Sequence, residues 1–194
     1  MTLLLSAWLF QGCNGKTKSS STTDSTAKQD VTAVKDTSIK KDTSAKMSVA
    51  ADNEDVKFAA EAASGGLTEV ALGKLAQQKG VDKRVKNFGG MMVMDHSKAN
   101  NEFKLLANSK NITLSTAPNA DDQKVIDEMS KKSGKDFDKA YVNDMVDDHK
   151  KDIKKFEEAS KNCKDPDIRA FATKTLSVLN KHLEAISAIH DSME

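Results

Sequence analysis

The sequence predicts an all-α fold, a four-helix bundle, and three observations point to it. Apolar residues recur every three or four positions in four long segments, which is the period of a helix and not of a strand. The longest connection, of about 25 residues, lies between the second and third segments, which fits a four-helix bundle whether this connection crosses the length of the bundle or turns back at once. It contains a short helical piece over residues 121–131. No segment shows the pattern of a β-hairpin or a βαβ unit.

The first two helices are expected over residues 55–79 and 82–109, with Gly80 as the stop signal between them. Their inner faces are recognised by apolar residues at helical spacing. In the first helix this stripe consists of Phe58, Ala62, Gly65, Glu69, Leu72 and Ala76. In the second helix it consists of Val85, Phe88, Met92, His96, Ala99, Phe103 and Leu106. Each stripe therefore carries one ionisable residue near its centre.

The second pair of helices is expected over residues 136–162 and from Pro166 onward. Asp165 is expected to cap the fourth helix, because aspartate is a favoured N-cap and proline fits the first turn. Asp138, near the start of the third helix, is expected to interact with the helix dipole. The third stripe consists of Phe137, Tyr141, Met145, His149, Ile153 and Phe156. The fourth consists of Ile168, Ala172, Thr175, Leu179, His182, Ile186 and Ile189.

Four ionisable residues thus lie on four largely apolar stripes: Glu69, His96, His149 and His182. At about 1.5 Å per residue they lie roughly 16 to 28 Å from the interhelix turns, in helices roughly 40 Å long. They are placed to converge near the middle of the bundle. Burying such groups is costly unless they are paired or bind a metal. The sequence therefore predicts either a metal site or a metal-free layer of hydrogen-bonded glutamate and histidine.

The metal interpretation expects one transition-metal ion at Glu69, His96, His149 and His182. Three imidazoles and one carboxylate form a common ligand set for zinc, copper or iron. Asp95, beside His96, is placed to orient a ligand histidine. The metal-free layer stays open as the alternative, and the domain would then be a structural or interaction module of the bacterial envelope.

Known catalytic motifs are not found in the sequence. A standard di-iron centre uses about four carboxylates and two histidines, including Glu-x-x-His on two helices. The residues three positions before the stripe histidines are Val93, Val146 and Leu179, none of which is a carboxylate. A ferroxidase centre of that kind is therefore not expected. The sequence also lacks a nucleophile elbow, a phosphate-binding glycine loop and a His-Glu-x-x-His motif, so whether the protein is an enzyme stays open.

The N-terminal part of the chain predicts a membrane anchor. Residues 1–13 form an apolar run ending in Cys13, which resembles a signal peptide followed by a lipidated cysteine. Residues 14–53 are rich in Ser, Thr and Lys, which predicts a disordered tether. Residues 54–194 form the helical domain. We expect a lipoprotein of the bacterial envelope, facing the periplasm or on the outer membrane; an ordinary cleaved signal peptide is the alternative.

Composition limits the choice of partners. The chain has 30 basic and 29 acidic residues, and aromatic residues make up 5% of it. Nucleic-acid binding is not expected, because there is no basic stripe and there are few aromatic residues for base stacking. The membrane is the one partner expected, through the lipid anchor. The sequence names no protein partner and leaves homo-oligomer formation open.

Several short motifs carry a resemblance to a known family. They are Ser64-Gly65-Gly66-Leu67-Thr68-Glu69-Val70, Gly73-Lys74-Leu75-Ala76, Met94-Asp95-His96, Phe137-Asp138 with Tyr141, Met145-Val146 with His149, Asp165-Pro166, and Leu179 with His182-Leu183. In this order, over residues 55–190, they resemble the uncharacterised bacterial family called domain of unknown function 4142, whose members are often labelled outer-membrane proteins. The resemblance implies a ferritin-like four-helix bundle, with counterparts of the glutamate, Asp-His and histidine positions. It implies no established activity.

Overall fold

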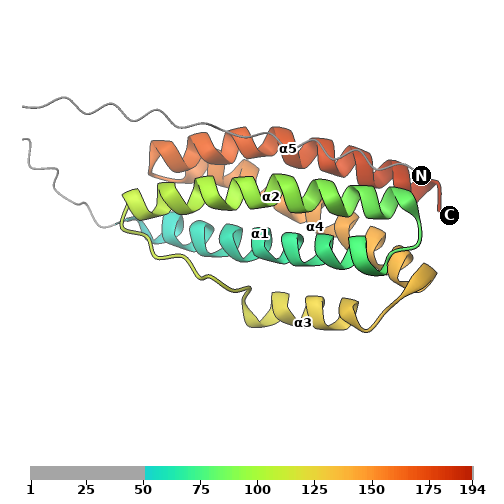
Figure 1. The fold of residues 1–194 in the computed structure, drawn as a ribbon. Helices are drawn as coiled ribbons and strands as arrows, with labels where there is room; N and C mark the ends of the chain where they lie inside the picture. The colour runs from blue at the N-terminus through green and yellow to red at the C-terminus, as the bar shows by residue number, and fades with distance from the viewer. Residues whose placement is uncertain (1–50, 194) are drawn as a thin grey trace, which may run out of the picture. The chain divides into compact units, whose positions relative to one another are not determined.

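The computed structural model describes residues 51–193, and within this range the chain is helical, with no strand (Figure 1). The predicted all-α fold is therefore confirmed. The helices are α1 (Asn53–Lys79), α2 (Lys83–Ser109), α3 (Ala120–Ser130), α4 (Gly134–Asn162) and α5 (Pro166–Asp191). The predicted signal peptide, Cys13 and the predicted tether up to residue 50 lie outside the described residues. No helix between residues 51 and 193 combines the length and apolarity needed to cross a bilayer.

The four long helices form two antiparallel hairpins, α1 with α2 and α4 with α5 (Figure 1). The connection between the hairpins runs along the length of the bundle, and its short helix α3 packs on the outside of α1. Consequently α2 and α4 run in the same direction, whereas α1 is antiparallel to α4. This is the arrangement of a bundle with one long crossover.

Aspartate and asparagine side chains start most of the helices. Asp52 accepts a hydrogen bond from the backbone N–H of Glu54, and Asp82 does so from that of Arg84. Asp165 caps α5 through the N–H groups of two residues, with Pro166 in the first turn, so this prediction is confirmed. Such caps satisfy N–H groups that have no partner inside the helix.

Two apolar clusters fill the core, and the ionisable residues lie between them. On α5, Leu179 belongs to the first cluster and Ile186 to the second, with His182 between the two. The largest side chains of the first cluster are Phe58, Phe103, Phe156, Phe171 and Leu179. Those of the second are Leu72, Phe88, Met92, Phe137, Tyr141, Met145 and Ile186. The polar residues therefore form a layer that apolar packing separates from both ends of the bundle.

The backbones of α1 and α2 are packed closely at two glycines. A Cβ atom at Gly89 would lie 2.7 Å from the Cβ of Ala76 and 2.7 Å from the carbonyl oxygen of Gly73. A Cβ atom at Gly73 would lie 2.7 Å from the carbonyl oxygen of Gly89. Neither position has room for a methyl group. The two glycines thus fix the spacing of the hairpin that carries Glu69 and His96.

Each interhelix turn is held by a buried aspartate of the other hairpin. The carboxylate of Asp138, on α4, accepts the backbone N–H groups of Val81 at 3.1 Å and Asp82 at 2.8 Å. The carboxylate of Asp55, on α1, accepts those of Lys164 at 2.7 Å and Asp165 at 2.8 Å. The expectation that Asp138 serves the dipole of its own helix is corrected, because its oxygens face the α1–α2 turn.

Replacing Asp138 by asparagine should destabilise the fold. The amide keeps one acceptor oxygen but turns an NH₂ group toward the turn, so one partly buried backbone N–H loses its partner at a cost of about 1 kcal/mol or more. Urea unfolding followed by circular dichroism measures this loss. Asp136→Asn, on the exposed side of the same helix, is the control for removing one charge. Equal midpoints for Asp138→Asn and wild type would contradict a structural role for this carboxylate.

Candidate functional site: a buried histidine–glutamate layer

The four predicted core residues meet in one layer, one from each long helix. Glu69 comes from α1, His96 from α2, His149 from α4 and His182 from α5. No more than 6% of the surface of any of the four remains exposed. The amphipathic pattern therefore places all four side chains in the interior, where they need partners other than water.

Three of these residues and Asp95 form a continuous chain of contacts. Glu69 Oε2 lies 2.7 Å from His96 Nδ1. On the other side of that ring, His96 Nε2 lies 3.4 Å from His182 Nδ1. The chain ends where His182 Nε2 lies 3.0 Å from Asp95 Oδ2. Asp95 is 31% exposed, so the chain runs from a fully buried carboxylate to the edge of the bundle.

His149 stands apart from this chain. Its Nδ1 lies 2.9 Å from the backbone carbonyl of Met145, which can only accept a hydrogen bond, so Nδ1 carries the proton. The other nitrogen, Nε2, lies 3.6 Å from Glu69 Oε1. Among the described residues, neither of these two buried atoms has a hydrogen-bond partner. Two buried polar atoms thus face each other at a distance too long for a hydrogen bond.

The three imidazole rings bring ligand-capable nitrogens close together. The ligand-capable atoms of His96, His149 and His182 all lie within 4.8 Å of one another. With Nδ1 of His149 and Nε2 of His182 donating to oxygen acceptors, the remaining nitrogen of each ring presents a lone pair. Lone pairs directed at one point are the requirement for metal coordination by imidazole.

Burial keeps these groups uncharged. Desolvation, followed by the negative charge of Asp152, raises the pKa of Glu69 from 4.5 to about 8. Burial lowers the pKa of His96 from 6.5 to about 4, and it also lowers the pKa values of His149 and His182. The three imidazoles are therefore neutral near neutral pH, which is the form that binds metal ions.

Two further carboxylates border the layer, and the sequence pattern did not single them out. Asp152 is buried and lies 3.2 Å from Lys155 Nζ. Asp148 is half-buried, and burial and the charge of Glu69 raise its pKa to about 8. Ligand-capable atoms of Glu69, Asp148 and His149 also lie within 4.8 Å of one another. Asp152 could have been recognised from helical spacing, because Asp152 lies one turn before the stripe residue Phe156 on the inner side of α4.

A small cavity of about 20 Å³ adjoins the layer. Its polar lining includes Glu69, His96, Asn100 and Asp152. A cavity of at least about 10–15 Å³ with two or more polar partners can hold a water molecule. The layer therefore has room beside Glu69 and His96 for one water or a ligand of similar size.

The geometry refines the predicted roles. Glu69, His96, His149 and His182 come together as expected, but one oxygen of Glu69 is engaged by His96 and only the other faces His149. Asp95 does contact a histidine of the cluster, namely His182 on α5 and not its neighbour His96. Coordination of an ion by these residues stays a prediction.

Glu69→Gln should change how the stability of the metal-free protein depends on pH. The folded chain holds the Glu69 proton up to about pH 8, whereas the unfolded chain releases it near the ordinary pKa of 4.5. The metal-free wild type therefore loses stability as the pH rises between these values. Glutamine has no such proton to lose, so the variant should be the more stable of the two above pH 8, by on the order of 2 kcal/mol.

The measurement is urea unfolding of chelator-treated protein at about pH 5 and about pH 9. The stability gap between Glu69→Gln and wild type should be larger at the higher pH. Glu128→Gln, on the exposed surface of α3, should stay within about 0.5 kcal/mol of wild type. A gap that is the same at both values would show that Glu69 is ionised in the folded chain.

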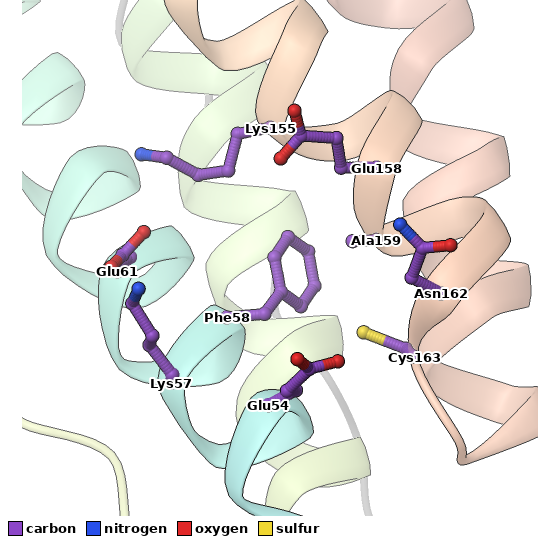
Figure 2. A pocket seen from close by; sticks show the side chains of 9 residues that line it. All are labelled: Glu54, Lys57, Phe58, Glu61, Lys155, Glu158, Ala159, Asn162 and Cys163. Atoms are coloured by element: carbon purple, nitrogen blue, oxygen red, sulfur yellow. The ribbon is translucent and has the colours of Figure 1, made fainter.

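A second concavity lies between α1 and α4, near the start of α1 and the end of α4. It has a volume of about 210 Å³ and is lined by Glu54, Lys57, Phe58, Glu61, Lys155, Glu158, Ala159, Asn162 and Cys163 (Figure 2). Cys163 is a buried free thiol, and burial followed by its hydrogen bond with Asp55 raises its pKa to about 12. A thiol with so high a pKa is a poor nucleophile and metal ligand.

Comparisons with known proteins agree with this fold. The chain is similar to a crystallised DUF305 fragment from Deinococcus radiodurans, with a TM-score of 0.65, 6% identity, and coverage of 74% of this chain and 99% of that one. It is also similar to a DUF305 protein from Streptomyces coelicolor, with a TM-score of 0.61, 10% identity, and coverage of 72% and 93%. At these identities the likeness concerns the fold alone. No curated protein matches the sequence.

The family assignment rests on the sequence itself. The sequence profile of the domain of unknown function DUF4142 matches residues 40–189. This range includes every long helix of the bundle up to the last turns of α5, and all four residues of the buried layer. The chain therefore belongs to the DUF4142 family, as the motifs around Glu69, His96, His149 and His182 indicated.

Proposed function

We propose that this chain is a cell-envelope protein whose helical domain binds a single transition-metal ion at Glu69, His96, His149 and His182. One observation carries the proposal: Glu69 Oε1 and His149 Nε2 are buried 3.6 Å apart, and neither has a hydrogen-bond partner among the described residues. A cation accepts both lone pairs and removes the cost of leaving them unpaired.

The spacing of the nitrogens supports the same conclusion. Two nitrogens bound to one tetrahedral ion at about 2.0–2.1 Å are separated by about 3.3 Å. The distance between His96 Nε2 and His182 Nδ1 is 3.4 Å. The opposite nitrogen of each ring contacts a carboxylate, Glu69 or Asp95. Such contacts fix the tautomer and the orientation of metal-binding histidines.

The ligand chemistry narrows the choice of ion. Neutral imidazoles suit zinc, copper and iron, and the carboxylate of Glu69 is compatible with all three. Hard cations such as magnesium and calcium prefer sites built from oxygen ligands. No reaction is assigned to the ion.

A metal-free polar layer is the second candidate, and the raised pKa of Glu69 favours it. Protonated Glu69 donates to His96 Nδ1, His96 Nε2 then donates to His182 Nδ1, and His182 Nε2 donates to Asp95. This chain of three hydrogen bonds joins four side chains without an ion. It leaves Glu69 Oε1 and His149 Nε2 unpartnered, which is why the metal-bound form ranks first. In the metal-free form the domain serves as a structural or interaction module.

Elemental analysis of the full chain, purified without chelators or a histidine tag, tests the proposal. We expect close to one zinc, copper or iron per chain, either as purified or after each ion is supplied in turn. His190→Ala, which removes a histidine at the end of α5 and outside the layer, should retain the ion. If the wild type binds none of these ions, the metal site is refuted and the polar layer becomes the preferred interpretation.

The envelope location is part of the same proposal. It rests on the apolar segment of residues 1–13 and on Cys13 as a lipidated residue. The structurally similar DUF305 protein from Streptomyces coelicolor is described as a secreted protein, which supports the same location. Membrane fractionation tests the anchor: wild type should sediment with membranes and Cys13→Ala should not. Equal sedimentation of both would contradict lipidation at Cys13.

A further inference from the structure

The seam between α1 and α4 contains a second set of ligand atoms beside the histidine cluster. We propose that a divalent metal ion binds first between Glu69, Asp148 and His149, and then passes to the position that includes all three histidines while Glu69 and His149 stay bound. This inference rests on the proposed metal site and adds the route by which that site is loaded.

The two groups share His149, and this makes them alternative positions for one ion. His149 Nδ1 is occupied by the carbonyl of Met145, so Nε2 is the single nitrogen available for both. One imidazole nitrogen coordinates one ion at a time. The two groups of ligand atoms are therefore alternative positions for one ion and not a two-metal centre. We call the group of Glu69, Asp148 and His149 the first station, and the group that includes all three histidines the second.

The first station is the one that solvent reaches. Asp148 is half-buried, whereas the three histidines and Glu69 are buried. Within residues 51–193, Asp148 makes no hydrogen bond or ion pair, so its oxygens are available to an arriving cation. Glu69 Oε1 and His149 Nε2, which are buried and unpartnered, face the same station from inside. Two buried ligand atoms and one half-buried carboxyl group thus form a site whose outer ligand is the least buried of the five residues.

The opposite edge of the cluster lacks this access. Asp95 is partly exposed there, but its Oδ2 contacts His182 Nε2, the nitrogen on the outer side of that ring. The lone pair of His182 is on Nδ1, which faces His96. An ion arriving at Asp95 would therefore meet the protonated Nε2 of His182 and not the lone pair on Nδ1.

Small side chains widen the α1–α4 seam next to Asp148. Gly65, one turn before Glu69, would place a Cβ atom 3.7 Å from Asp152 Oδ2, so without one it leaves space in front of that carboxylate. Lys155 pairs with Asp152 and also lines the larger pocket further along the seam (Figure 2). Glu61, Gly65 and Glu69 follow one another at helical spacing on α1, and Glu61 lines that pocket.

Ligand chemistry sets the direction of transfer. Two carboxylates and one imidazole bind a partly hydrated ion, whereas three imidazoles bind zinc or copper with softer ligands. In the transfer the bond to Asp148 breaks and bonds to His96 Nε2 and His182 Nδ1 form, while Glu69 and His149 stay bound. No electron is exchanged. The neutral imidazoles release no proton, whereas Glu69 and Asp148, which are protonated at neutral pH in the metal-free chain, release theirs to solvent when the ion first binds.

The test separates the rate of loading from the affinity. Co²⁺ is mixed with the metal-free full chain, and its visible absorption reports both the rate of binding and the ligand set. Asp148→Asn should load at least about tenfold more slowly, because it removes a carboxylate ligand from the position that the ion binds first. Its final spectrum should equal that of the wild type, and its Co²⁺ affinity should be retained. Asp147→Asn, with the same charge change on an exposed neighbour, should load at the wild-type rate.

Each alternative result has a defined meaning. Equal slowing by both variants would overturn the inference in favour of a general effect of charge. A changed final spectrum or a large loss of affinity in Asp148→Asn would make Asp148 a permanent ligand and also overturn it. Two Co²⁺ ions per wild-type chain would do the same. No Co²⁺ binding by the wild type would refute the proposed site itself. Circular dichroism of the metal-free variants, with Asp148→Ala as a second substitution, excludes misfolding as the cause.

Discussion

Replacing both His96 and His149 by alanine should abolish the stabilisation of this protein by metal ions. These residues contribute nitrogens from α2 and α4, which belong to different hairpins. An ion bound to the folded chain alone stabilises it by about 4 kcal/mol at a free concentration 1,000 times Kd. We therefore expect Zn²⁺ to raise the unfolding midpoint of the wild type and to leave that of the double variant unchanged.

Thermal unfolding with Zn²⁺ and with a chelator measures this difference, because each protein is compared with itself. The cavity that the two alanines create lowers the stability of the variant under both conditions and cancels in the comparison. His190→Ala should respond to Zn²⁺ as the wild type does. A Zn²⁺-dependent shift that survives in the double variant would place the ion outside the buried layer.

Gly89→Ala should strongly destabilise the first hairpin. Its Cβ atom would lie 2.7 Å from the Cβ of Ala76 and from the carbonyl oxygen of Gly73, and neither can move without shifting a helix. Overpacking of this kind costs about 1–3 kcal/mol or more. The wider spacing of α1 and α2 would also move Glu69 away from His96, so metal affinity should fall with stability.

The neighbouring glycine supplies the matched control. A Cβ atom at Gly90 would meet only the side-chain nitrogen of Gln77, at 3.1 Å, and that side chain can rotate away. Alanine is preferred over glycine inside a helix by about 0.8–1.0 kcal/mol, so Gly90→Ala should be stabilising. Urea unfolding of the two variants should give shifts of opposite sign. A stable Gly89→Ala protein would mean that α1 and α2 are not held at this spacing.

The fold could be predicted from the sequence because its signal is repeated many times. Each long helix carries six or seven stripe residues, and the predicted range of 82–109 differs from the observed Lys83–Ser109 by one residue. The short helix in the crossover was expected over 121–131 and is found at Ala120–Ser130. The course of the connection between the second and third long helices was not predictable. The helix lengths are compatible with a connection that turns back at once and with one that crosses the length of the bundle.

The composition of the polar layer was predictable, but its internal pairing was not. Periodicity places Glu69 and the histidines on inner faces, with an uncertainty of about two helical turns in height. Which oxygen meets which nitrogen depends on helix rotation and side-chain torsions, to which the periodicity of a stripe is insensitive. For this reason the contact of Asp95 with His182 across the α2–α5 seam emerges only from the structure.

Buried carboxylates were the least visible feature in the sequence. Asp55 and Asp138 stand near helix N-termini, where an aspartate is already favoured by the helix dipole. That local explanation concealed their actual partners, which are backbone amides more than 50 residues away in the chain. Asp148 has no such default role, but a charged residue at the edge of a stripe is typical of a solvated face.

The reciprocal contacts of Asp55 and Asp138 make the two hairpins interdependent. Each hairpin supplies the carboxylate that satisfies the turn of the other. A hairpin on its own would leave its turn amides without these acceptors, so neither half is expected to be stable alone. Unfolding should therefore be a single cooperative event for the whole bundle. An ion held between the hairpins would then be retained until that event, and its lifetime in the protein would be limited by global unfolding or by passage through the α1–α4 seam.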